Sequence, residues 1–176
     1  LYPTLRFSCA NSAASLGSSG DVGEYLRPGI ALYGSSPFPG RSAASLGLKP
    51  VLRLVSQIIA MRTIGPGQSI GYGATWIAQR QTRMGVIPIG YADGFIRALS
   101  PGAVVVIGGQ RVPLVGRVSM DMVTVDLTDH PEAGLGSEVE LWGEQVTVDE
   151  QANQAGTLGY ELLSGLGERV ERVYQQ

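Results

Sequence analysis

The distribution of glycine restricts the possible folds of this chain more than any other feature. The 176 residues include 25 glycines, which recur between short runs rich in valine and isoleucine. Valine and isoleucine favour strands, whereas glycine adopts the backbone conformations that tight turns require. From about residue 48 onward this alternation predicts an all-β domain of about eight strands, so the expected fold class is mainly β.

The same alternation locates individual elements. Gly108-Gly109 separates two apolar runs and suits a hairpin turn with positive φ. Short helices are expected at residues 149–155, which end at a glycine, and at residues 160–163. The expected strands lie at residues 51–64, 84–89, 103–107, 110–115, 123–127, 137–141, 145–148 and 168–174.

The beginning of the chain follows a different pattern. A short strand is expected to end at Ser8-Cys9-Ala10, and Asn11 and Ser12 are good N-cap residues before alanines that favour a helix. Such a helix start either binds an anion through its free N–H groups or is an ordinary cap. A connection rich in proline, glycine and serine follows, so we divide the chain into domains 1–40 and 41–176.

Composition and charge exclude several classes of function. A formal net charge of −2 gives little support for a nucleic-acid or anionic-membrane partner. No apolar run approaches the roughly 20 residues of a membrane helix. His130 is the only histidine and Cys9 the only cysteine. We therefore expect no metal site and no Ser-His-Asp triad, and Cys9 forms no internal disulfide.

Three tyrosines remain as candidates for proton transfer. Tyr72 and Tyr91 follow glycines and Tyr160 follows Gly159, so backbone or ligand can approach them closely. A tyrosine acts as a base near neutral pH only if its pKa falls by roughly three units, about 4 kcal/mol of phenolate stabilisation. A guanidinium or a cationic cofactor can supply this. The alternative for an isolated tyrosine in a β protein is half-buried packing.

Five motifs occur in order along nearly the whole chain. They are Ala10-Asn11-Ser12-Ala13-Ala14, Leu26-Arg27-Pro28-Gly29-Ile30, Gly71-Tyr72-Gly73-Ala74-Thr75, Ile89-Gly90-Tyr91-Ala92-Asp93-Gly94 and Gly116-Arg117-Val118-Ser119-Met120-Asp121. Each motif alone is weak, but the ordered set is highly specific and resembles that of alanine racemases.

The resemblance implies a cytoplasmic two-domain enzyme that uses pyridoxal 5′-phosphate (PLP) to racemise L- and D-alanine by a two-base mechanism. In that family a TIM-type (β/α)₈ barrel binds the cofactor. A C-terminal β domain or barrel completes the active site of the other subunit in a homodimer. Residues 1–40 would then be the end of a PLP-binding barrel, most of which is missing because a barrel takes about 250 residues.

On the cofactor side, the resemblance implies roles for five residues. Ser12, Gly29 and Ile30 are expected to bind the PLP phosphate, the last two through backbone N–H groups. Arg27 is expected to face the pyridine nitrogen and, since arginine keeps its proton, to leave that nitrogen unprotonated. Tyr160 is expected to touch the cofactor phosphate.

On the substrate side, the resemblance implies that Tyr72 is the base for one face of Cα, contributed across the dimer. Tyr91 and Met120 are expected to contact the substrate, with Asp121 beside them.

The chain departs from the family at several positions. Ser8 stands where many relatives have histidine, Gly71 where serine often precedes the tyrosine, and Trp76 where tyrosine is common. Lys49, the only lysine, does not match the family's Schiff-base lysine, so we expect a fragment that is inactive alone. The alternatives are a broad-specificity or serine racemase of the same family, or a non-catalytic β module for dimerisation.

Overall fold

A computed structural model describes residues 4–17, 23–99 and 102–175. Its contacts divide the chain into two compact units, Leu1–Leu52 and Arg53–Gln176. All strands assigned within the described residues belong to the second unit. The assignment of residues 1–40 and 41–176 to two domains stays a prediction.

The first unit contains short helical segments set by local capping. In helix α1 (Ser12–Leu16) the Asn11 side chain accepts a hydrogen bond of 3.0 Å from the Ala14 N–H, as the N-cap pattern predicts. The 3-10 helices η1 (Ile30–Tyr33) and η2 (Ala44–Leu46) follow. The strand expected before α1 is reduced to isolated bridges, from Ser8 to Gly23 and from Ala10 to Leu26.

Seven strands of the second unit form one antiparallel sheet, which confirms the predicted mainly β fold. Their order is β1-β9-β6-β7-β8-β5-β2, and β3 (Ser69–Ile70) pairs with β4 (Trp76–Ile77) in a separate ladder. The strands of the sheet are β1 (Leu54–Gln57), β2 (Ala60–Ile64), β5 (Thr82–Ile87), β6 (Val104–Ile107), β7 (Gln110–Val115), β8 (Val123–Asp126) and β9 (Glu138–Trp142).

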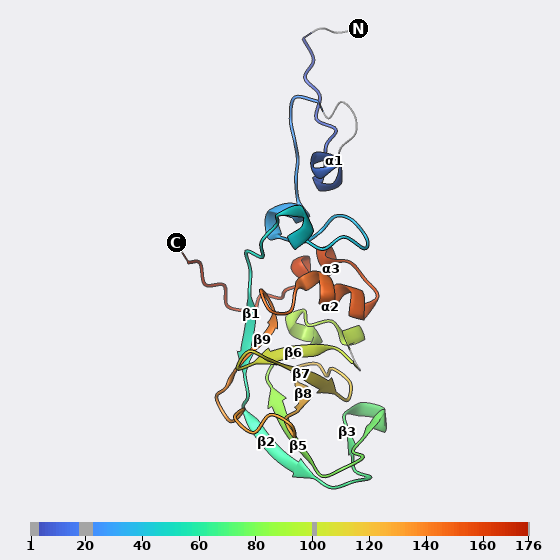
Figure 1. Cartoon of the computed structure of the whole chain (residues 1–176), viewed down its shortest axis with the longest axis vertical. Coiled ribbons are helices and arrows are strands. Elements are labelled where there is room, and N and C mark those ends of the chain that lie inside the picture. The colour runs from blue at the N-terminus through green and yellow to red at the C-terminus, as the bar shows by residue number, and fades with distance from the viewer. Residues whose placement is uncertain (1–3, 18–22, 100–101, 176) are drawn as a thin grey trace. The chain divides into compact units, whose positions relative to one another are not determined.

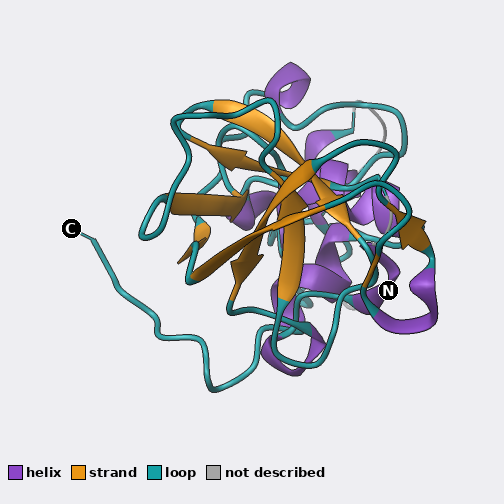
Figure 2. Cartoon of the chain, turned by 90° about the horizontal axis from the view of Figure 1, so that it is seen from below, coloured by secondary structure: helices purple, strands orange, loops and turns teal. Residues whose placement is uncertain are grey.

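The sheet curls because its two edge strands are consecutive in the chain. Only Ile58 and Ile59 separate β1 from β2. The Ile58 N–H donates to the Ser137 carbonyl at 3.1 Å, beside β9, and the Ile59 N–H donates to Val86 of β5 at 2.9 Å. Figure 2 shows the strands turning around a common interior. The single strand predicted over residues 51–64 is therefore two strands, each paired with a different neighbour.

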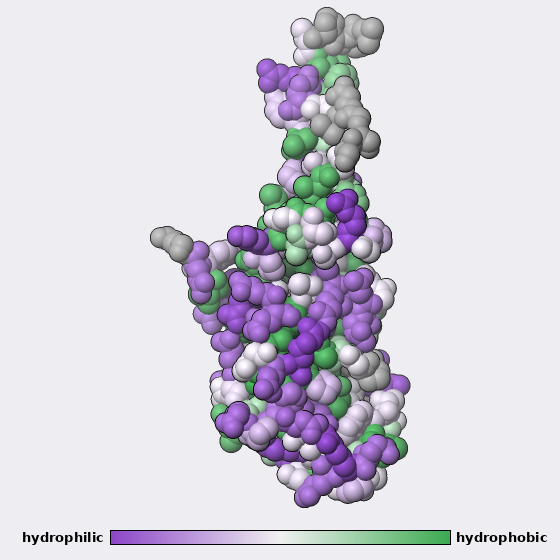
Figure 3. Space-filling view, viewed as in Figure 1, coloured by the Kyte–Doolittle hydropathy of each residue, from purple (hydrophilic) through white to green (hydrophobic). Residues whose placement is uncertain are grey.

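The side chains of alternate strand residues point inward and fill the interior of the curled sheet. Fully buried aliphatic side chains come from several strands, and Phe95 stacks on Trp142 with ring centroids 6.1 Å apart. A Cβ at Gly85 would lie 2.8 Å from the Leu127 side chain, so β5 passes close to the core there. On the face seen in Figure 3 the surface over the strands is largely hydrophilic. The core aliphatics include Ile87, Val105, Val112, Val125, Val139 and Leu141.

Two helices close the chain beside the sheet. Helix α2 (Val148–Ala155) begins at the Thr147 cap and ends at Gly156, whose φ is 70°. Helix α3 (Gly159–Ser164) lies beside it (Figure 1). Both helices confirm the predictions, but the strand expected at residues 145–148 is wrong. Residues 145–146 form a bend and Val148 already begins α2, because the Thr147 hydroxyl caps the helix.

A buried glutamine fastens α2 to the sheet. Gln151 is 1% exposed, and its Nε2 donates to the carbonyls of Val104 in β6 and Leu141 in β9, at 2.8 and 2.6 Å. A buried amide is tolerated because its donors are used.

We expect Gln151→Met to lower the free energy of unfolding by about 2–3 kcal/mol, because it keeps the volume and removes two buried hydrogen bonds. Urea denaturation measures this. The control is Gln154→Met, the same change at an exposed position of α2, which should be nearly neutral. Equal stability of the two variants would contradict the role of the buried amide.

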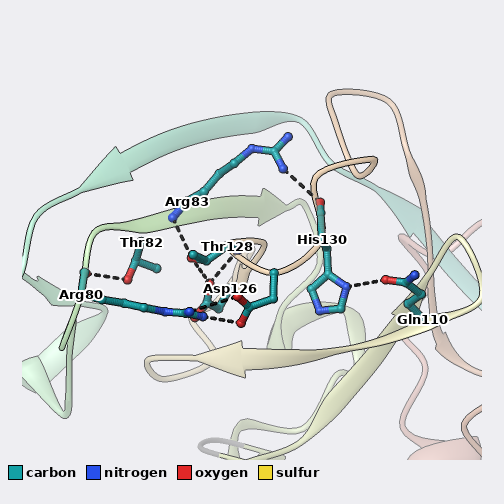
Figure 4. Close-up of polar contacts among 8 residues, drawn as sticks. Arg80, Thr82, Arg83, Gln110, Asp126, Thr128 and His130 are labelled. Carbon is teal, nitrogen blue, oxygen red and sulfur yellow. Dashed lines mark hydrogen bonds and ion pairs between the residues drawn. The ribbon is translucent and has the colours of Figure 1, made fainter.

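The loop after β8 is held by Arg80 and Arg83, at the start of β5, and by Gln110 of β7 (Figure 4). Arg80 forms an ion pair with Asp129, and the Arg83 backbone N–H donates to the Thr128 hydroxyl at 3.0 Å. His130 Nδ1 lies 2.8 Å from Gln110 Oε1. The only histidine of the chain thus has a structural contact in this loop.

The pH dependence of this loop follows from the Arg80–Asp129 pair. Hydrogen bonding from Arg80 holds the pKa of Asp129 below its ordinary value. Ionised Asp129 therefore stabilises the fold above the unfolded pKa of about 4, and the contribution is lost as the pH falls through the lower folded pKa.

We expect the stability difference between the wild type and Asp129→Asn to shrink as the pH is lowered from roughly 6 to 3. Denaturation curves across this range measure it. In Arg80→Ala, NMR titration should place the pKa of Asp129 higher than in the wild type. An unchanged titration would show that Arg80 is not the cause.

Candidate active site

The segment at residues 116–121, between β7 and β8, is where the predicted substrate-side residues meet; we call it the central segment. Its first contact is with the loop that carries Tyr72. A Cβ at Gly71 would lie 2.9 Å from the Arg117 nitrogen, and a Cβ at Gly116 would lie 2.8 Å from the Ile70 carbonyl oxygen. Both glycines have positive φ, 78° and 72°. Two backbones touch here because neither glycine carries a side chain.

Tyr72 projects from this contact. It begins the 3-10 segment η3 (Tyr72–Ala74), and its side chain is 71% exposed. Ala74 has a φ of 49°, a conformation that costs an L-residue roughly 1–2 kcal/mol. The Arg117 guanidinium lies 3.7 Å from the point where Gly73 would carry a Cβ. The loop is therefore a tight turn that holds a phenol in solvent with a guanidinium nearby.

The loop of Tyr91 is bonded to the other end of the central segment. In η4 (Tyr91–Asp93), the N–H groups of Tyr91 and Ala92 donate to the carbonyls of Ser119 and Met120, each at 3.0 Å. A Cβ at Gly90 would lie 2.3 Å from both of these carbonyl oxygens. Glycine is required at position 90 because the two backbones leave no room.

Met120 and Asp121 lie on a turn of the central segment itself. The Ser119 hydroxyl donates to the Met122 carbonyl at 2.7 Å and accepts from its N–H at 3.1 Å. This turn leaves Met120 53% exposed. The structure thus brings Tyr91, Met120 and Asp121 together, and attaches the Tyr72 loop to the same short segment.

The turn after α3 connects Tyr160 to this assembly. Tyr160 lies on α3, and beyond that helix the Gly167 N–H donates to the Asp93 carbonyl at 3.0 Å. One nitrogen of Arg169, Nη2, lies 2.9 Å from Oδ1 of Asp93 and 2.9 Å from Oδ1 of Asp121. Hydrogen bonding to Asp121, together with the charge of Asp93, raises the pKa of Arg169.

The strand predicted at residues 168–174 is wrong. Residues 168–170 form a turn and a bend, and no strand is assigned in the described part that follows. Among the described residues, no strand pairing involves this segment. Arg169 lies outside all five motifs, so no signal in the sequence indicates its contacts, whereas Asp93 lies inside one of them.

Three predicted phosphate-binding residues meet in the first unit. The Ser12 hydroxyl is buried and accepts hydrogen bonds from the N–H groups of Gly29 at 2.9 Å and Ala31 at 3.2 Å. Ile30 lies between these two residues and is buried. A hydroxyl and backbone N–H groups at one turn are the kinds of donor that suit phosphate oxygens, so the residue types fit the phosphate of PLP. The Gly29 N–H would have to exchange the Ser12 hydroxyl for a phosphate oxygen in order to bind it.

Arg27 is held in place by Ser8. The Arg27 Nε donates to the Ser8 hydroxyl at 2.9 Å, its Nη2 to the Ser8 carbonyl at 3.3 Å, and its backbone N–H to Ala10 at 2.7 Å. A guanidinium fixed in this way is a permanent donor, which fits a partner for an unprotonated ring nitrogen. Ser8, which departs from the family pattern, therefore orients Arg27.

A cavity of about 520 Å³ in the second unit includes none of the predicted site residues. Its cation, Arg53, is already paired with Glu138 at 2.9 Å and Glu140 at 3.1 Å. Within residues 4–17, 23–99 and 102–175, no three His, Cys, Asp or Glu side chains are grouped to hold a metal ion. No helix among these residues is long and apolar enough to cross a membrane.

Comparison with known proteins identifies the family. The family described as "Alanine racemase, C-terminal domain" matches residues 51–174, which is most of the chain. The chain belongs to the alanine racemase family. This confirms the resemblance drawn from the motifs.

Individual alanine racemases are similar over nearly the whole chain. The enzyme of Stutzerimonas stutzeri is 55% identical over 172 residues, which are 98% of this chain and 48% of that relative. The crystal structure of biosynthetic alanine racemase from Pseudomonas aeruginosa has a TM-score of 0.93 and 54% identity, covering 96% of this chain and 47% of that one.

The alanine racemase of Bartonella henselae, solved with covalently bound pyridoxal phosphate, has a TM-score of 0.87 and 36% identity. The match covers 98% of this chain and 48% of the Bartonella chain. The chain therefore spans about half the length of the curated relatives it matches.

The close backbone approach at Gly90 gives a stability test of the site. We expect Gly90→Ala to lower the free energy of unfolding by about 3 kcal/mol, because the new Cβ overlaps two carbonyl oxygens of the central segment. Thermal or urea denaturation measures it. Gly134→Ala is the matched control, since no atom lies within 4 Å of its Cβ position. A stable Gly90→Ala variant would contradict the described approach.

Proposed function

We propose that the full-length protein is an alanine racemase that uses PLP to interconvert L- and D-alanine. The observation that carries the proposal is the convergence of two glycine-framed tyrosine loops on the central segment, each with an exposed phenol. Membership of the alanine racemase family supports the same reaction.

The cofactor would be bound partly by the first unit. Ser12 and the N–H groups of Gly29 and Ile30 would bind its phosphate, and the Arg27 guanidinium would face its ring nitrogen. When bound, PLP withdraws the electron pair left on Cα as the α-hydrogen departs. Arg27 keeps its own proton, so it holds the ring nitrogen unprotonated and moderates this withdrawal.

Tyr72 would move the proton on one face of Cα. The Tyr72 phenolate oxygen would accept the α-hydrogen of one enantiomer as a proton. In the opposite direction of the reaction, the Tyr72 hydroxyl would donate a proton to the same face of Cα and so form that enantiomer. Arg117, whose guanidinium lies beside the backbone of Gly73, adds positive charge to this loop.

The remaining predicted residues would surround the reacting centre. Tyr91 and Met120 would contact the substrate, with Asp121 beside them on the same turn, and Tyr160 would touch the PLP phosphate. These side chains are exposed in the isolated chain, with Tyr91 at 41% and Tyr160 at 49%. Their exposure supports a homodimer in which the central segment completes the site of the partner subunit.

The second base would come from outside this chain. Lys49 precedes Pro50 in the first unit and lies backbone to backbone with Gly34, where a Cβ would be 2.0 Å from the Lys49 oxygen. Lys49 does not match the position of the family's Schiff-base lysine. We therefore assign the cofactor-anchoring lysine to the part of the relatives that this chain does not span.

The proposal is tested by Tyr72→Phe in the full-length holoenzyme. We expect α-hydrogen exchange to fall by about 100-fold or more for one alanine enantiomer and far less for the other, because only one face loses its base. Solvent-deuterium incorporation into L- and D-alanine, followed separately, measures this.

The control is Tyr174→Phe, the same change at a tyrosine that is 87% exposed and lies outside the site. It should leave both exchange rates as in the wild type. Equal, near-wild-type exchange of both enantiomers by Tyr72→Phe would overturn the assignment of Tyr72.

A further inference from the structure

We propose that Arg169 is a positioning residue: its guanidinium locks the Tyr91 loop and the turn bearing Met120 and Asp121 into one arrangement. The inference rests on the proposed racemase function. Arg169 lies outside the motifs that carry the family resemblance, and its own side chain touches the supporting carboxylates of Asp93 and Asp121.

The first step of the argument is the geometry at the guanidinium. A single nitrogen, Nη2, lies 2.9 Å from one carboxylate oxygen of Asp93 and 2.9 Å from one of Asp121. Two carboxylates brought to one point repel each other unless a cation lies between them. Arg169 therefore supplies the charge that lets the two loops approach through their acidic side chains.

Asp93 also holds the backbone of the Tyr91 loop through hydrogen bonds. Its second oxygen, Oδ2, accepts the Gly90 N–H at 2.8 Å, and its carbonyl accepts the Gly167 N–H at 3.0 Å. A Cβ at Gly94 would lie 2.3 Å from the Gly165 carbonyl oxygen. The loop is thus held on one side by the turn after α3, while its N–H groups are bonded to the central segment on the other.

Arg169 closes this set of contacts into a ring. From α3 the contacts run through Gly167 to Asp93, along the Tyr91 loop to Met120, and from Asp121 back to Arg169. Met120 and Tyr91 are 53% and 41% exposed, so packing of their own side chains does not fix them. Their positions depend on these backbone and ionic contacts.

The ion pairs contribute to position far more than to stability. The side chains of Arg169 and Asp121 are each 54% exposed, whereas that of Asp93 is 14% exposed and keeps the Gly90 N–H as a second partner. Exposed ion pairs contribute little to the free energy of unfolding, because water solvates the separated charges well. Loss of the Arg169 side chain should therefore disturb the two loops while the curled sheet stays folded.

The experiment uses Arg169→Ala in the full-length holoenzyme. We expect kcat for alanine to fall by about 10- to 100-fold, since misplacing reacting groups by about 1 Å has effects of this size. The unfolding midpoint should stay near that of the wild type. Hydrogen–deuterium exchange should accelerate at residues 90–94 and 119–122, and Arg169→Lys should restore a large part of both properties by returning the charge.

The matched control is Arg62→Ala. It removes the same charge at an exposed position of strand β2, outside this ring of contacts. It should leave kcat and the exchange of both loops unchanged. Combining Arg169→Ala with Asp121→Asn should lower kcat by less than the product of the separate effects, because the two residues share one contact.

The possible outcomes separate the two proposals. An inactive wild-type holoenzyme would contradict the proposed racemase function, and the exchange of the two loops would still test Arg169. Unchanged exchange at those loops, or wild-type kcat in Arg169→Ala, would overturn the positioning role. A fall in kcat accompanied by faster exchange throughout the sheet and a lower unfolding midpoint would also overturn it, since the residue would then support the fold as a whole.

Discussion

Close contact between backbones is the constraint on which the candidate site depends. Gly71 lies against the nitrogen of Arg117, and Gly90 lies against the carbonyls of Ser119 and Met120, at separations that leave no room for a Cβ. These approaches place two tyrosine loops on one short segment of chain. Because the phenols themselves remain exposed, the glycines contribute more to their placement than the packing of the aromatic rings does.

The curled sheet provides the rigid support for these contacts. The central segment connects β7 to β8, two neighbouring strands, and the Tyr91 loop follows β5, which pairs with β8. Since hydrogen bonding continues through Ile58 and Ile59 from one edge strand to the other, the strand ends cannot move independently. Gln151 extends this support to α2, and the stacking of Phe95 on Trp142 joins the end of the Tyr91 loop to β9.

Local chemistry explains which elements could be predicted from the sequence. The hairpin at Gly108-Gly109 and the helices capped by Asn11 and Thr147 are confirmed, because their signals lie within a few residues of each other. The strands expected at residues 145–148 and 168–174 are wrong. Short apolar alternation does not reveal whether a partner strand is available, and a hydroxyl at a helix start competes with strand pairing.

The sequence by itself determined the family and the mainly β fold, since ordered motifs and glycine-separated apolar runs are properties of the chain alone. The predicted roles of Tyr72, Tyr91, Met120 and the cofactor-side residues stay predictions. Only the tertiary structure decided that the tyrosine loops share one segment, that Ser8 orients Arg27, and that Arg169 joins Asp93 to Asp121. Such contacts join residues far apart in the chain, so their distances depend on how the sheet curls and not on spacing in the sequence.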